Sequence, residues 1–248
     1  MNVKPHWALV ALLLATQTGN AGEAKHGHWA YTGREGPAHW ASLEPGFATC
    51  GKGHSQSPIN LAHAVDTALP PIDFDYRPDG YRVVNNGHAI QVDFKPGSHI
   101  RIDNTDFELK QVHFHVPSEH TVDGKRFPME AHLVHADAQG RLAVVAVLFK
   151  DGANNAWLES IWPKVPAKAG GNAKLPTAVN AAALLPSGHD YYRYSGSLTT
   201  PPCSEQVRWL VLKQPVAASA KEVAFVHDAV GQNNNRPVQA LGARTIQQ

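Results

Sequence analysis

The chain has 248 residues, a hydrophobic fraction of 43% and a formal net charge of +1 at pH 7. These values are typical of a globular protein with one large domain or two small ones and a sizeable core. The low charge, with no cluster of lysines and arginines, argues against a nucleic-acid partner. Fifteen histidines stand beside only two methionines. Histidine is the commonest metal ligand and titrates near neutrality, but most of the fifteen must be ordinary surface or packing residues.

The N-terminal segment predicts an export signal. A short basic start precedes an apolar stretch at residues 7–15, which is too short to span a bilayer. Small residues place the cleavage after Ala21, so we expect residues 1–21 to be a signal peptide and 22–248 to be the mature domain. Loss of Lys4 leaves that domain with no net charge. The alternative is a buried N-terminal helix; export predicts a periplasmic or secreted protein with no membrane insertion.

The chain contains two cysteines, Cys50 and Cys203. An even number in an exported protein predicts one disulfide, and two free thiols are the alternative.

Short segments rich in β-formers, separated by Gly and Pro, follow one another along the chain. The predicted strands are 81–84, 89–94, 99–102, 107–115, 131–135, 142–149, 191–194 and 205–212. Residues 142–149 form a long apolar run, which predicts a strand buried on both faces. Helical spacing predicts helices at 153–162 and 219–230, with a short helical turn at 180–184. Residues 165–174 are predicted to be a surface loop. No linker divides the chain, so we predict a single, mainly β domain (α+β class) with a large central sheet and peripheral helices.

Three histidines lie in two neighbouring predicted strands. Side chains alternate faces along a strand, so His113 and His115 point the same way. His132 can join them if the next strand pairs antiparallel. Three imidazoles with a fourth position left open are typical of a catalytic Zn²⁺ site. Gln111 and Glu130, each two residues before a histidine, are placed to accept the second N–H of its ring.

Several long segments, in order from about residue 28 to the C-terminus, resemble α-class carbonic anhydrases. They are HWAY (28–31), GPAHW (36–40), QSPIN (56–60), NNGHA (85–89), FHVPSEHTVD (114–123), EAHLVH (130–135) and YSGSLTTPP (194–202). Val116 and Pro117, which replace the Trp-Gly of many animal members, and the cysteine pair resemble bacterial members. The resemblance implies a twisted, mostly antiparallel sheet and a conical site with zinc at its base.

The resemblance also implies an enzyme, a carbonate dehydratase of the lyase class. Its reaction would be the zinc-dependent, reversible hydration of carbon dioxide to bicarbonate and a proton, by attack of zinc-bound hydroxide on CO₂. The family's zinc ligands map onto the three histidines, and its gatekeeping pair maps onto Glu119 and Thr199. An ionised Glu119 only accepts hydrogen bonds, so Thr199 must donate its proton to it. The Thr199 oxygen then accepts from a protonated oxygen such as hydroxide, which aims that oxygen at the substrate.

A proton exit is implied as well. His88 occupies the family's proton-shuttle position, and histidine titrates near neutrality. The alternative for His88 is a solvated histidine in a turn. Tyr31, Asn86 and Gln91 match positions that order solvent, with Gln91 in place of the asparagine common there.

The substrate side is implied to be an apolar wall that holds CO₂, with Thr200 also at the substrate site. The wall residues are Val134, Val144, Leu198, Val207 and Trp209. Each of these five could instead be an ordinary core residue. His120 and His135 are better explained by structural hydrogen bonds.

Two other functions compete with this interpretation. One is a binding module on the same fold that has lost catalysis; relatives of that kind typically lack a zinc histidine. The other is a zinc hydrolase acting on esters. The expected partner is a small molecule, CO₂ or bicarbonate. The sequence leaves the oligomeric state open, with a dimer among the options.

Overall fold

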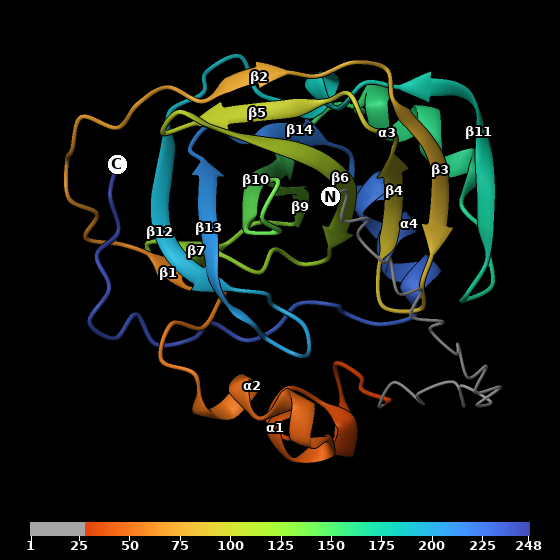
Figure 1. Ribbon diagram of the computed structural model, residues 1–248. Coiled ribbons are helices and arrows are strands. Elements are labelled where there is room, and N and C mark those ends of the chain that lie inside the picture. Colours follow the sequence, from red (N-terminus) through yellow and green to blue (C-terminus); the bar gives the residue numbers. More distant parts are fainter. Residues whose placement is uncertain (1–27) are drawn as a thin grey trace, which may run out of the picture.

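A computed structural model describes residues 28–248 (Figure 1). The predicted signal peptide, residues 1–21, lies outside the described residues. The described chain forms a single domain around an 11-stranded sheet, whose main path runs β11-β3-β4-β6-β9-β10-β13-β12. Its strands are β2 (Asp73–Asp75), β3 (Gly80–Asn85), β4 (Ile90–Phe94), β5 (His99–Ile102), β6 (Thr105–His115), β9 (Met129–Ala136), β10 (Leu142–Asp151), β11 (Asn172–Val179), β12 (Tyr191–Ser197), β13 (Glu205–Leu212) and β14 (Val216–Ala218).

Smaller elements surround this sheet. A second, three-stranded sheet contains β1 (Asn60–Leu61), β7 (Thr121–Val122) and β8 (Lys125–Arg126). The helices are α1 (Trp40–Leu43), α2 (Thr49–Lys52), α3 (Ala156–Ile161) and α4 (Ala220–Val230), with 3-10 turns η1 (Gly33–Glu35), η2 (Pro45–Phe47), η3 (Trp162–Lys164) and η4 (Ala181–Leu184). Across residues 28–248, no helix has the length and apolar character that a bilayer crossing requires.

The large sheet is mostly antiparallel, as predicted. The parallel pairs within it are β10 with β13 and β10 with β14. The strands predicted at 99–102 and 205–212 coincide with β5 and β13, and the other predicted strands lie within one to three residues of observed ones. Residues 143–149 of β10 are buried, which confirms a strand covered on both faces.

The loop predicted at 165–174 is wrong at its end, because residues 172–174 belong to β11. This strand pairs with β3 on one side only, at the edge of the sheet, and most of its side chains are exposed. Its side chains therefore lack the hydrophobic alternation that marks a half-buried strand.

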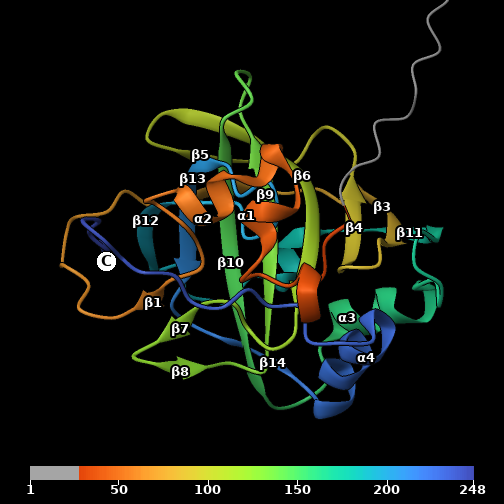
Figure 2. The same ribbon diagram turned by 90° about the horizontal axis from the view of Figure 1, so that it is seen from below.

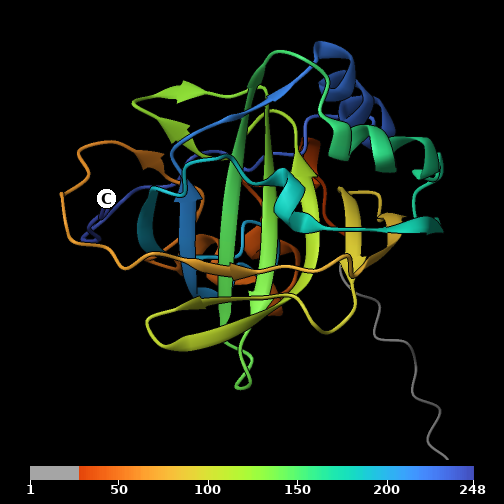
Figure 3. The same ribbon diagram turned by 90° about the horizontal axis from the view of Figure 1, so that it is seen from above.

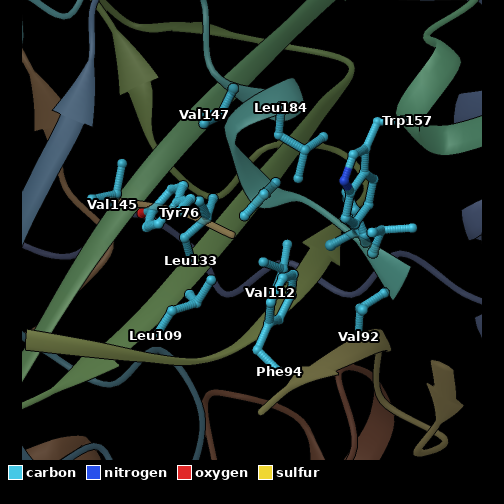
Figure 4. Packing of buried hydrophobic residues seen from close by; sticks show 14 of the residues in the cluster. Tyr76, Val92, Phe94, Leu109, Val112, Leu133, Val145, Val147, Trp157 and Leu184 are labelled. Atoms are coloured by element: carbon cyan, nitrogen blue, oxygen red, sulfur yellow. The ribbon is translucent and has the colours of Figure 1, made fainter. Parts of the chain in front are cut away.

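The two faces of the sheet have different roles. The main core fills one face, where side chains such as Val112, Leu133 and Val145 pack with Trp157 and Leu184 (Figure 4). β2 and the β5–β6 hairpin cross this face (Figure 3). The short helices α1 and α2 lie over the opposite face, in front of β6, β9 and β10 (Figure 2). Because side chains alternate along each strand, the residues between the core positions project toward this second face.

Candidate metal centre

The pairing of β6 with β9 brings the three predicted ligands together. The strands are antiparallel, and His113 lies directly opposite His132. The ring centroid of His115 lies 4.9 Å from that of His113 and 4.5 Å from that of His132. One nitrogen from each ring lies within 4.8 Å of the other two. The predicted convergence of three imidazoles from two strands is therefore confirmed.

Two of these rings are oriented by the residues that the sequence singled out. His113 Nδ1 lies 2.8 Å from Gln111 Oε1, and His132 Nε2 lies 2.8 Å from Glu130 Oε1. Each pair shares a strand face, since its members are two residues apart. These contacts leave His113 Nε2 and His132 Nδ1 free to bind a metal ion.

The third ring is held by a group that the sequence analysis missed. His115 Nδ1 donates to the main-chain oxygen of Asn234, at 2.6 Å. His115 Nε2 is buried and has no hydrogen-bond partner among residues 28–248. A buried polar atom of this kind is costly unless something binds it. Three nitrogens facing one point, one of them otherwise unsatisfied, fit a divalent metal such as Zn²⁺.

The electrostatics favour metal binding over protonation. Burial lowers the pKa of His113 well below its usual value, and the neighbouring histidines add to this. Burial also lowers the pKa of His115 to about 4 and depresses the pKa of His132. The rings are therefore neutral at pH 7, as a metal ligand must be.

Glu119 lies at the base of the site and is fully buried. Its Oε1 accepts a hydrogen bond from the main-chain N–H of Arg236 at 2.7 Å, and its Oε2 lies 3.6 Å from His115 Nε2 and 4.0 Å from His132 Nδ1. Burial raises the pKa of this carboxyl to about 7, although the nearby His132 lowers it. A divalent cation held by the histidines would favour the ionised form.

Thr199 lies beside this carboxylate. Its hydroxyl is close enough to lower the pKa of Glu119, although Oε2 receives no full hydrogen bond from any described residue. The segment around Thr199 is fixed on both sides by main-chain bonds, from Leu198 N to Ser204 O and from Cys203 N to Thr200 O. The structure thus brings the predicted pair together.

A cavity of about 140 Å³ opens next to the histidines. It is lined by Trp29, Tyr31, Asn86, His88, Ala89, Gln91, Gln111, His113, His115 and Thr200. His88 is half-buried and stacks on Trp29, with ring centroids 3.8 Å apart. Burial lowers the pKa of His88, and His28 lowers it further. Trp29 has no role that the sequence predicts, since only the fold brings it to His88.

The three residues expected to order solvent all line this cavity. The side-chain amides of two of them, Asn86 and Gln91, are already hydrogen-bonded to other protein groups. Asn86 Oδ1 accepts from the main-chain N–H groups of His88 and Ala89, and Gln91 Nε2 donates to Asp93 Oδ1. The Tyr31 hydroxyl is buried and makes no hydrogen bond to the described residues.

The predicted apolar wall is one packed cluster on the site face of the sheet. Val144, Val207 and Trp209 are buried in it, and Val134 and Leu198 pack against it half-buried. The ring of Trp209 lies 4.8 Å from that of the candidate ligand His132. The apolar surface of Trp209 therefore adjoins the candidate metal site.

The remaining candidates have structural roles. Cys50 in α2 forms a disulfide with Cys203, as predicted, across a sequence separation of 153. His135 points toward the main core, where its Nε2 lies 2.8 Å from the Tyr76 hydroxyl. His120 is hydrogen-bonded to Glu130. The expectation of structural hydrogen bonds for both histidines is confirmed.

Three convergent, oriented imidazoles beside a buried carboxylate and a cavity form a candidate three-histidine metal centre on a mainly antiparallel sheet. A family model described as eukaryotic-type carbonic anhydrase matches residues 35–248. A carbonic anhydrase of Pectobacterium carotovorum is 45% identical over 219 residues, which cover 88% of this chain and 90% of that protein. A carbonic anhydrase of Neisseria gonorrhoeae is 44% identical over 243 residues, covering 98% and 96%.

A solved structure gives the same result. The α-carbonic anhydrase of Thermovibrio ammonificans, in complex with the inhibitor sulfanilamide, is similar with a TM-score of 0.88 and 46% identity, covering 90% of this chain and 99% of that chain. This chain belongs to the eukaryotic-type, or α-class, carbonic anhydrase family. It is accordingly a lyase of the carbonate dehydratase type, which hydrates CO₂ reversibly.

Proposed function

We propose that this enzyme hydrates CO₂ with Zn²⁺ held by His113, His115 and His132, and that His88 carries the product proton away. The observation that supports this most strongly is the buried, unpartnered His115 Nε2, which faces free nitrogens of the two other rings. When bound there, Zn²⁺ supplies a Lewis acid that lowers the pKa of a coordinated water toward neutrality, as is established for this enzyme family.

The role of Thr199 follows from counting donors and acceptors. The Glu119 carboxylate already accepts the main-chain N–H of Arg236 through Oε1, which leaves Oε2 for a second donor. An ionised carboxylate can only accept, so Thr199 donates its single hydroxyl proton to Oε2. The Thr199 oxygen then accepts a hydrogen bond from the attacking oxygen, which orients a lone pair of that oxygen toward the carbon of CO₂.

The apolar wall has a matching role for the substrate. The side chains of Val144, Val207 and Trp209 form an apolar surface. Such a surface suits a small nonpolar molecule such as CO₂, because it demands no hydrogen bonds from that molecule. Val134 and Leu198 complete this surface. The Thr200 hydroxyl, which lines the cavity, provides a polar contact for the more polar product, bicarbonate.

His88 has a suitable place for proton export. Its half-buried ring lines the same cavity as two of the zinc ligands and stacks on Trp29. A group with a pKa near 7 that sheds protons to water alone is limited to roughly 10³ s⁻¹. A histidine that takes up the proton and passes it to buffer removes this limit. Tyr31, Asn86 and Gln91 line the route that the proton would take through solvent.

We also propose that the protein is exported to the periplasm or secreted, with residues 1–21 removed. The Cys50–Cys203 disulfide supports this location, because such bonds persist in oxidising compartments.

Zinc stoichiometry tests the proposed site. The purified protein is expected to bind one zinc ion per chain, and His113→Ala to weaken that binding by at least 100-fold. His135→Gln is the matched control, since His135 is a buried histidine of β9 that faces the core. Equal zinc affinity in the parent and in His113→Ala would contradict the assignment.

A further inference from the structure

The carboxylate of Glu130, which orients the ligand His132, is saturated with donors. Its Oε2 accepts the main-chain N–H groups of Glu119 and His120, both at 2.8 Å. Its Oε1 accepts His132 Nε2 at 2.8 Å and His120 Nδ1 at 2.6 Å. His120 and His132 hold the pKa of Glu130 well below its usual range, against the effect of burial. The close cluster of His120, Glu130 and His132 is therefore satisfied internally and is not a second metal site.

Hydrogen-bond counting fixes the direction of the contacts beyond Glu130. His120 Nδ1 donates to the carboxylate, so His120 Nε2 accepts from the Tyr194 hydroxyl, 2.7 Å away. The Tyr194 oxygen then accepts from the Ser57 hydroxyl at 2.9 Å, and Ser57 Oγ accepts from Ser197 N at 3.0 Å. In the opposite direction, the Ser57 proton would have no acceptor among the described residues. When the hydrogen bonds run in this one direction, every donor and acceptor group in this chain of contacts has a partner.

The far end of these contacts reaches the segment that carries Thr199. Ser57 N donates to Ser197 Oγ at 2.9 Å, and the Ser197 hydroxyl donates to Leu198 O at 2.7 Å. Gly196 permits this approach, because a Cβ there would lie 2.1 Å from Ser57 Oγ. The contacts therefore join the metal ligands to the residues that precede Thr199.

All members are removed from water. Ser57, His120 and Ser197 have no exposed surface, and Tyr194 is 3% exposed. A broken hydrogen bond here leaves a buried polar group unsatisfied, which costs more than the loss of an exposed one. Such a network holds its members in a single geometry.

We propose that Tyr194 and His120 are positioning residues for the metal. With Ser57 and Ser197 they form what we call the Tyr194 network, which holds Glu130, and through it the His132 ring, in the orientation that retains zinc. The inference rests on the proposed zinc function and adds to it a determinant of metal retention. Groups bonded directly to a ligand typically change metal affinity 10- to 100-fold, and Tyr194 is two hydrogen bonds further from the metal. We therefore expect a smaller effect, about 3- to 10-fold.

The test is the rate at which zinc passes from the loaded protein to an excess of a chromogenic chelator. Tyr194→Phe removes one hydroxyl and keeps the ring that stacks on Trp209. It is expected to release zinc about 3- to 10-fold faster than the parent. Tyr76→Phe is the matched control. It also removes a tyrosine hydroxyl that is hydrogen-bonded to a buried histidine, but that histidine is His135, which makes no hydrogen bond to Glu130. Its release rate is expected to stay within about twofold of the parent.

Ser57→Ala provides a second variant at the far end of the network. It keeps His120 and Tyr194 intact and is expected to give a smaller increase in the same rate. Zinc release at the parent's rate in both network variants, or an equal increase in Tyr76→Phe, would overturn the inference. If the parent bound zinc but did not hydrate CO₂, the proposed function would be wrong. The comparison of zinc release rates would still test whether the Tyr194 network retains the metal.

Discussion

Replacement of both cysteines by serine is expected to lower the free energy of unfolding by about 5 kcal/mol. The Cys50–Cys203 bond joins α2 to the segment that follows Thr200, across 153 positions of sequence. In the chain-entropy model, closing a loop of this length at 25 °C removes unfolded-state entropy worth about 5 kcal/mol. A protein of this size loses about 2–4 °C of Tm per kcal/mol, so the variant should melt about 10–20 °C lower.

The assay is urea unfolding, followed by tryptophan fluorescence, of the oxidised parent, the reduced parent and the Cys50→Ser/Cys203→Ser variant. Zinc must be saturating throughout, because metal binding itself stabilises the folded state. The reduced parent and the variant should unfold at similar urea concentrations, and reductant should not affect the variant. A loss below about 2 kcal/mol, or two alkylatable thiols in the native parent, would refute the reasoning.

Three further predictions concern single side chains. His88→Ala should limit turnover in weak buffer to roughly 10³ s⁻¹, and imidazole should partly restore it; an unchanged rate in weak buffer would exclude the shuttle role. Burial lowers the pKa of His135 to about 3, so the unfolded chain takes up a proton that the folded protein refuses as the pH falls below 6.5. The parent should therefore lose about 2 kcal/mol more stability than His135→Gln between pH 7.5 and 5 in chemical unfolding, and parallel pH profiles would contradict this. Gln111→Ala should weaken zinc binding 10- to 100-fold in a chelator competition. Gln91→Ala is the control and should leave zinc binding unchanged, because the Gln91 amide bonds to Asp93. Equal zinc affinities of the two variants would show that Gln111 does not orient His113.

The predictable part of the fold is the part in which side-chain pattern and burial agree. Strands such as β5 and β13 have a regular hydrophobic pattern and were predicted with their observed bounds. β11 was missed entirely, because an edge strand with exposed side chains is held mainly by its main-chain bonds to β3. The helices α1 and α2 span four residues each, too few to show a helical period.

The candidate site also has a part that the sequence predicts and a part that it does not. Alternation along a strand was sufficient to pair Gln111 with His113 and Glu130 with His132, because each pair is local. The main-chain partners of His115 and Glu119 come from positions 234 and 236, in an irregular C-terminal segment more than 110 residues away. All residues except proline carry the same main-chain N–H and C=O groups, so side-chain identity carries almost no signal for such contacts. The stacking of Trp29 on His88 depends in the same way on the packing of the N-terminal segment against the sheet.

The central claim is that CO₂ hydration by this chain depends on zinc at the three-histidine site. It is tested most directly by stopped-flow hydration of CO₂ with the zinc-loaded protein, the chelator-stripped protein and the stripped protein after one equivalent of zinc is restored. We expect rapid hydration by the zinc-loaded protein, the uncatalysed rate with the stripped protein, and recovery of activity once zinc is restored. Activity that survives complete zinc removal, or that is absent from the zinc-loaded protein, would contradict it.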